Sequence, residues 1–279
     1  MSALKHKLNS HQVNLCEKIK RTLGTQDMAS VNRIFILDIL RAIAILAMIF
    51  YHFVYDLGDF GYINLITVVN GYWKLFAQSI GCSFLFLSGL SFWIAAKNEI
   101  NWPKYLKRLM FLISAALLIS LATYIQFGHG FIFFGILHLL ATCSIFALFI
   151  YRLPTLILLT LGIGLFILPE YYHASQFYNE ALFSSRYLAW TGLYDGRTGS
   201  VDFYAFMPWS AAFVFGLAMA KVFIKPETRQ NKSPLSFKEE KPNFFLATLL
   251  WMGRNSLLVY LIHQPILYGL FYGVQKLMT

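Results

Sequence analysis

Residues 34–54, with the sequence IFILDILRAIAILAMIFYHFV, decide the fold class of this chain. The run is long and apolar enough to cross a bilayer as one helix, yet it contains Arg41 and His52. Ionisable side chains are expensive in hydrocarbon, so these two positions are candidates for function. Their eleven-residue spacing is three turns plus about 20°, so we expect both side chains on one helix face, roughly 16 Å apart along the axis.

The composition extends this conclusion to the whole chain. Of 279 residues, 58% are hydrophobic and 13% are charged, against a usual charged share of about 25%. Repeated apolar stretches of about 20 residues predict an all-α, polytopic membrane helix bundle that forms one domain over residues 34–279. About seven spans are expected, at residues 34–54, 72–96, 109–127, 131–151, 153–168, 204–222 and 255–275. Segment 244–252 is too short to cross, and we expect it along the inner interface; if it crosses instead, the C-terminus changes side.

The basic residues predict the orientation. The net charge of +10 would also fit nucleic-acid binding, but its distribution along the chain argues against that class. With the N-terminus in the cytoplasm, the inner segments 1–33, 97–108, 152 and 221–254 hold 18 of the 23 Lys and Arg residues, which is the positive-inside pattern. The basic segment 1–33 lacks the apolar region of a cleavable signal, so the first span is expected to remain as an anchor.

Two further histidines lie in predicted spans. We expect His138 about seven residues into the fourth span, and His263 in the middle of the last, followed by Gln264 and a proline. A single buried histidine is usually a packing residue, but three of them together with Arg41 favour a shared polar cavity. No two of the histidines have the close spacing of metal ligands on one helix, so we expect no metal site.

Asp38 offers another explanation for Arg41. The two residues are three positions apart, so they can form an intrahelical ion pair near the inner interface, with Arg41 reaching toward water. That pairing would account for Arg41 without a ligand. It would leave His52 unexplained.

Two loops are long enough to carry function or flexibility. The outer loop 169–203 is rich in Tyr, Ser, Gly and charged residues and is expected to take part in recognition. Asp202, at its end, either caps the sixth span or faces a substrate. The inner loop 225–243 contains three prolines and mixed charge, and it is expected to act as a flexible linker.

These residues suit a reaction that spans the bilayer. Histidine is a general base near physiological pH, and arginine binds phosphate or carbonyl groups. An anionic donor would bind near Arg41 at the cytoplasmic side and extend a long arm toward His52. Acyl-coenzyme A has this shape, with phosphates at one end and a thioester at the other.

Several motifs carry a resemblance to a known family. Leu37-Asp38-Ile39-Leu40-Arg41-Ala42, followed by Met48 and His52, resembles the first-helix signature of the transmembrane acyltransferases. The more detailed resemblance, over residues 33–275, is to the bacterial branch related to the catalytic domain of heparan-alpha-glucosaminide N-acetyltransferase. It rests on residues 51–57, 134–138, 207–209, 253–256 and 263–265. Ala42 stands where that family usually has glycine, which removes no functional group.

The resemblance implies transfer of an acetyl or other acyl group from cytoplasmic acyl-coenzyme A to an extracytoplasmic glycan or amino sugar. It implies an O- or N-acyltransferase of the bacterial inner membrane, with His52 as the leading catalytic residue. Whether His52 acts as a general base or carries the acyl group stays open. We expect Arg41, His138 and His263 to complete the catalytic site, and Arg41, Asp38 and Arg254 to bind the donor.

Two alternatives come from other classes of function. Buried His and Asp groups also serve proton relays, so a proton-coupled transporter is one alternative, although the chain shows no internal repeat. A non-catalytic membrane partner that keeps the fold is the other, because function resides in the site and not in the fold.

Overall fold

A computed structural model describes residues 35–175, 186–194, 198–224 and 243–278. The predicted basic segment 1–33 and nearly all of the predicted linker 225–243 lie outside these residues. All regular structure in the described ranges is helical, which confirms the all-α prediction. The elements are α2 (Phe35–Asp59), α3 (Leu65–Val68), α4 (Gly71–Ala96), α5 (Trp102–Phe127), η1 (Gly128–Gly130), α6 (Ile136–Ile150), α7 (Thr155–His173), η2 (Arg186–Thr191), α9 (Phe206–Phe223), α10 (Phe244–Arg254) and α11 (Ser256–Met278).

Six described helices are long and apolar enough to cross a membrane, namely α2, α4, α5, α7, α9 and α11. The predicted fourth span, 131–151, is shorter than expected, because helix α6 begins only at Ile136. The residues before it are not helical and pair with the chain ahead of α9: Tyr204 donates its N–H to the carbonyl of Phe134 at 3.0 Å. The predicted fifth span is longer than expected and continues through Pro169 to His173.

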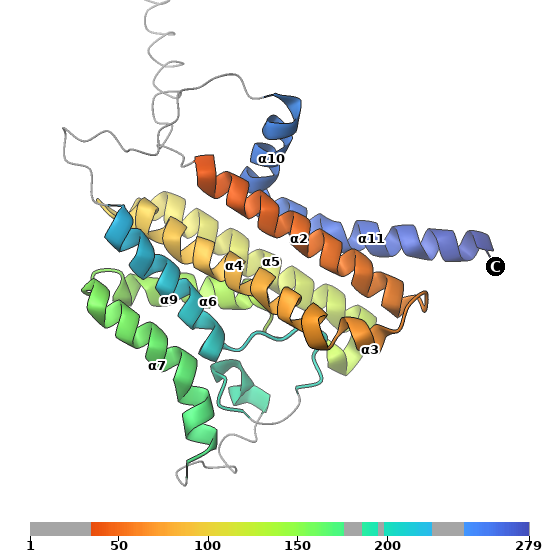
Figure 1. Cartoon of the computed structure of the whole chain (residues 1–279), viewed down its shortest axis with the longest axis horizontal. Helices are drawn as coiled ribbons and strands as arrows, with labels where there is room; N and C mark the ends of the chain where they lie inside the picture. Colours follow the sequence, from red (N-terminus) through yellow and green to blue (C-terminus); the bar gives the residue numbers. More distant parts are fainter. Residues whose placement is uncertain (1–34, 176–185, 195–197, 225–242, 279) are drawn as a thin grey trace, which may run out of the picture.

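The long helices reverse direction along the chain and bring distant segments together at two ends (Figure 1). One end holds the start of α2 and the close of α4 and α9, where the Trp93 indole donates to the carbonyl of Ile224 at 2.8 Å. We call it the inner end, after the predicted orientation. The outer end holds the extended segments before α6 and α9. Each transmembrane helix therefore presents one end to each side of the bundle.

Helices α4 and α9 pack with their backbones in close contact. A Cβ atom added at Gly89 of α4 would overlap the carbonyl oxygen of Phe213, and one added at Gly216 of α9 would overlap that of Phe86. Only glycine allows two backbones to approach this closely. The main core cluster, which includes Phe213 and Leu217, lies along this contact.

Helices α10 and α11 both pack against α2. The short helix α10 lies beside the inner end of α2 in Figure 1, with Phe244 and Trp251 exposed, and its expected position along the inner interface stays a prediction. Helix α11 then runs along α2 (Figure 1). Phe271 anchors its outer half, with its ring centroid 5.4 Å from that of Phe53 and 5.5 Å from that of Phe60.

Candidate active site

An ion-pair cluster occupies the inner end of α2. Asp38 is 5% exposed, and its two oxygens accept from two arginines: Oδ1 lies 3.2 Å from Arg41 Nη1, and Oδ2 lies 3.3 Å from Arg254 Nε. Arg41 also donates to the Ser91 hydroxyl of α4. The structure thus contains the intrahelical pair and adds a second cation from α10. One carboxylate faces two guanidinium groups, which leaves the cluster with a positive charge.

A cavity of about 290 Å³ lies beside this cluster, where α4 ends and α5 begins. Two cations line it, Lys104 and Arg108, together with apolar side chains of α4 and with Ser144 of α6. Arg108 Nη2 lies 3.5 Å from the Ser88 hydroxyl of α4, one turn from the serine that receives Arg41. Sequence reasoning missed this cavity, because it used these basic residues only for orientation.

His52 and His263 meet in the outer half of the bundle. Their ring centroids lie 4.9 Å apart, with the rings inclined at 59°. His263 Nδ1 lies 2.6 Å from the carbonyl oxygen of Tyr260, so this nitrogen carries the proton and Nε2 holds the lone pair. Within the described residues, His263 Nε2 and His52 Nδ1 are buried and have no hydrogen-bond partner. Two imidazoles in contact therefore keep ring nitrogens available for chemistry.

Asp56 and Gln264 join the same two helices beside the histidines. The Gln264 amide donates to Asp56 Oδ1 at 2.8 Å, and Asp56 is 1% exposed. Asp56 Oδ2 and Gln264 Oε1 are buried without a partner among the described residues. Sequence reasoning assigned Asp56 no role. The available signal was its spacing, one turn beyond His52.

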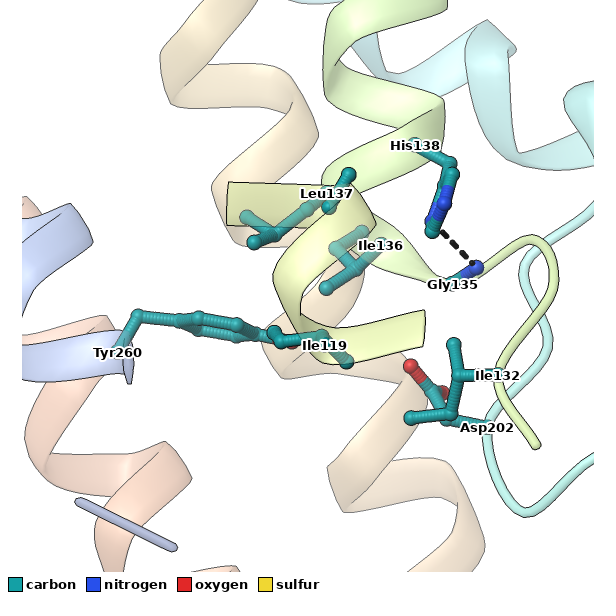
Figure 2. Close-up of a pocket in the computed structure, with 9 residues that line it drawn as sticks. Ile119, Ile132, Gly135, Ile136, Leu137, His138, Asp202 and Tyr260 are labelled. Atoms are coloured by element: carbon teal, nitrogen blue, oxygen red, sulfur yellow. Dashed lines mark hydrogen bonds between the residues drawn. The ribbon is translucent and has the colours of Figure 1, made fainter. Parts of the chain in front are cut away.

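His138 occupies a different environment. It is the third residue of α6, not seven residues into a span, because the helix starts late. Its Nδ1 accepts the backbone N–H of Gly135 at 3.3 Å (Figure 2), and its Nε2 lies 3.2 Å from the Ser120 hydroxyl. That hydroxyl donates to the carbonyl of Ile132 at 2.6 Å. Both ring nitrogens of His138 are thus engaged by protein groups.

The structure brings two of the three predicted histidines together and sets the third apart. Tyr260 lies between them: its ring centroid is 5.7 Å from that of His263, and it also lines a small cavity of about 10 Å³ that His138 borders. Figure 2 shows Tyr260 reaching across toward this cavity from α11. The expected shared cavity of three histidines is therefore divided by a tyrosine ring.

Asp202 borders the same small cavity and contacts the start of α6 (Figure 2). Its carboxyl receives the backbone N–H groups of Ile136 and Phe203, so it caps α6 and not the helix that follows it. Burial raises the pKa of this carboxyl to about 6, although the two N–H groups act to lower it. A Cβ atom at Gly135 would lie 2.7 Å from Asp202 Oδ2, so glycine gives the carboxylate access to the helix terminus.

The outer loop is described only in part. Its first residues belong to α7, while residues 176–185 and 195–197 lie outside the described residues, so the expected role in recognition stays a prediction. Trp190 of η2 contacts Phe134, with ring centroids 6.0 Å apart. In the described parts of the chain, no group of three or more His, Cys, Asp or Glu side chains lies close enough to hold a metal ion.

Comparison with known proteins places the sequence in a family. Residues 33–265 match the family described as heparan-alpha-glucosaminide N-acetyltransferase, catalytic. No curated protein and no solved structure matches the chain. The match covers most of the chain and includes α2, the inner arginine cluster and His263. The chain therefore belongs to the heparan-alpha-glucosaminide N-acetyltransferase catalytic-domain family, which implies a membrane acetyltransferase.

Proposed function

We propose that this protein transfers an acetyl or related acyl group from cytoplasmic acyl-coenzyme A to an extracytoplasmic glycan or amino sugar. The observation that carries the proposal is the contact between His52 and His263, whose buried ring nitrogens lack hydrogen-bond partners among the described residues. His52 shares α2 with the arginine cluster at the inner end. One helix thus connects a cationic site to a pair of potential bases.

The inner end suits the anionic part of the donor. Asp38 neutralises only part of the charge of Arg41 and Arg254, and the neighbouring cavity adds Lys104 and Arg108. Coenzyme A carries several phosphate charges at one end, and arginine binds phosphate in a bidentate manner. Arg41 and His52 lie roughly 16 Å apart along the axis of α2. In this proposal, the thin arm of the donor covers that distance.

The proposed orientation places this inner end in the cytoplasm of a bacterial inner membrane. The described basic residues support it, because they gather at the inner end and few lie at the outer end. Those at the inner end are Lys97, Lys104, Lys107, Arg108, Arg152, Lys221 and Arg254; those at the outer end are Lys74, Arg186 and Lys276.

The chemistry requires one proton acceptor and one proton donor. As the acceptor nitrogen or oxygen attacks the thioester carbonyl carbon, an imidazole lone pair such as Nε2 of His263 takes its proton. The carbon–sulfur bond breaks, its electron pair leaves on sulfur, and the proton passes to sulfur to give the free thiol. In the alternative route, a His52 nitrogen attacks the thioester carbonyl carbon, the carbon–sulfur bond breaks, and the other ring nitrogen's proton passes to sulfur to give the thiol. The acceptor then attacks the acyl-imidazole, the carbon–nitrogen bond breaks, and the acceptor's proton returns to the imidazole.

Acetyl transfer from labelled acetyl-coenzyme A to D-glucosamine, with the protein in lipid nanodiscs, tests the proposal. His52→Ala and His263→Ala should each lower the rate by about 10²–10⁴-fold, the usual contribution of general acid–base catalysis. His129→Ala, which changes an exposed outer turn, is the matched control and should leave the rate unchanged. A His52→Ala protein with full transfer activity would remove His52 from the mechanism. Solute uptake into proteoliposomes without coenzyme A, in place of acetyl transfer, would support a transporter.

A further inference from the structure

The hydrogen bond between Gln264 and Asp56 leaves two acceptor atoms unused. Gln264 directs its amide NH₂ toward Asp56 Oδ1, so its carbonyl oxygen Oε1 points elsewhere. Asp56 Oδ2 is likewise buried, and neither oxygen has a partner within the described ranges. A buried acceptor without a donor is costly, and more so when it is charged. Both atoms accept hydrogen bonds, so a group that completes this site must donate them.

The position of the two acceptors relates them to the histidines. Asp56 lies four residues beyond His52 on α2, so the two side chains share a helix face about 6 Å apart along the axis. Gln264 directly follows His263 on α11. Along α2 the order from the inner end is therefore arginine, histidine, aspartate. A donor that arrives from the inner end and an acceptor that arrives from the outer end would meet at His52.

We propose that Asp56 Oδ2 and Gln264 Oε1 bind the nucleophilic group of the acyl acceptor through its N–H or O–H hydrogens. This inference rests on the proposed function and assigns its acceptor site. The carboxylate attracts a protonated amine more strongly than a neutral hydroxyl, so Asp56 determines the preference for an amine. The bound ammonium group first loses one proton to an imidazole, which passes it to water, and the neutral amine then attacks. Asp56 and Gln264 are thereby specificity residues, while proton removal belongs to the imidazoles.

Steady-state kinetics with glucosamine and acetyl-coenzyme A tests this assignment. Asp56→Asn keeps the side-chain size and removes the charge, and it should raise the KM for glucosamine by about tenfold to a hundredfold, the usual range for a hydrogen bond to a charged group. Gln264→Ala removes the second acceptor atom and should raise the same KM. Both variants should retain the wild-type KM for acetyl-coenzyme A and its hydrolysis in the absence of sugar. Asp59→Asn, an exposed position three residues further along α2, is the matched control.

The outcomes separate this inference from the proposed function. A wild-type protein that turns over no acetyl-coenzyme A would overturn the proposed function. Active Asp56→Asn and Gln264→Ala proteins with an unchanged KM for glucosamine would overturn the acceptor assignment alone. If the Asp56–Gln264 hydrogen bond only holds α2 and α11 together, the variants should instead show a lower kcat and a higher KM for both substrates. The amine preference has its own readout, since Asp56→Asn should reduce the ratio of glucosamine to glucose acetylation.

Discussion

Asp202 links its protonation state to the stability of the outer end of the bundle. Its carboxyl has an ordinary pKa of 3.8 in the unfolded chain and a pKa of about 6 in the structure, where it lies against the start of α6. Between about pH 4 and 6, the carboxyl is therefore protonated in the folded protein and ionised in the unfolded chain. Its contribution to the free energy of unfolding falls as the pH rises from about 4 to about 6. Asp202→Asn should abolish that decrease. Thermal unfolding at several pH values, with Asp59→Asn as control, should show a flatter profile only for Asp202→Asn; parallel profiles would contradict this.

The individual residues of the site were only partly predictable from sequence. The shared face of Arg41 and His52 follows from helix periodicity, and the Asp38–Arg41 pair from a spacing of three residues. The hydrogen-bond partners of His138 do not follow from the sequence, because they depend on the late start of α6 and on Ser120 of another helix. The approach of His263 to His52 depends on the packing of α11 against α2, for which a single sequence carries no local signal.

Helix α10 holds Arg254 in place through one close contact. A Cβ atom at Gly253 would overlap the backbone carbonyl of Asp38, which cannot move aside as a side chain can. We expect Gly253→Ala to cost about 1–3 kcal/mol of stability and to raise the KM for acetyl-coenzyme A, because Arg254 moves away from Asp38. Gly273→Ala is the control, since nothing lies within 4 Å of a Cβ atom at that position. Equal stability of the two variants in thermal unfolding would show that α10 packs less closely against α2 than the structure indicates.

The positions of the helices were predictable from sequence where a long apolar run forms the whole helix. They were less predictable elsewhere. The predicted spans near α2, α4, α9 and α11 agree with the structure, because runs of this length can only be buried in lipid or protein. The predicted start of α6 was wrong because residues 131–135 are not helical, and Phe134 pairs with the distant backbone of Tyr204. The predicted end of the fifth span at residue 168 was wrong because α7 continues through Pro169 to His173, and a proline is tolerated inside a membrane helix.

The orientation of the whole molecule can be measured directly. In a background with Cys16, Cys82 and Cys143 replaced by serine, single cysteines are introduced at Asp59 of the outer end and at Asn98 of the inner end. A membrane-impermeant maleimide applied to intact cells should label Asp59→Cys at once. It should label Asn98→Cys only after permeabilisation, because inner segments rich in Lys and Arg stay in the cytoplasm. The opposite pattern of labelling would invert the bundle and place the arginine cluster outside.

The two cavities share no lining residue, and this separation has an energetic consequence for the cell. The inner one is large and bordered by cations, while the outer one has a volume of about 10 Å³, close to that of a single probe sphere. In the energised membrane that the proposed function requires, an open path through the bundle would also conduct ions. Because these two cavities are separate, the proposed outward transfer of acyl groups would not need such a path.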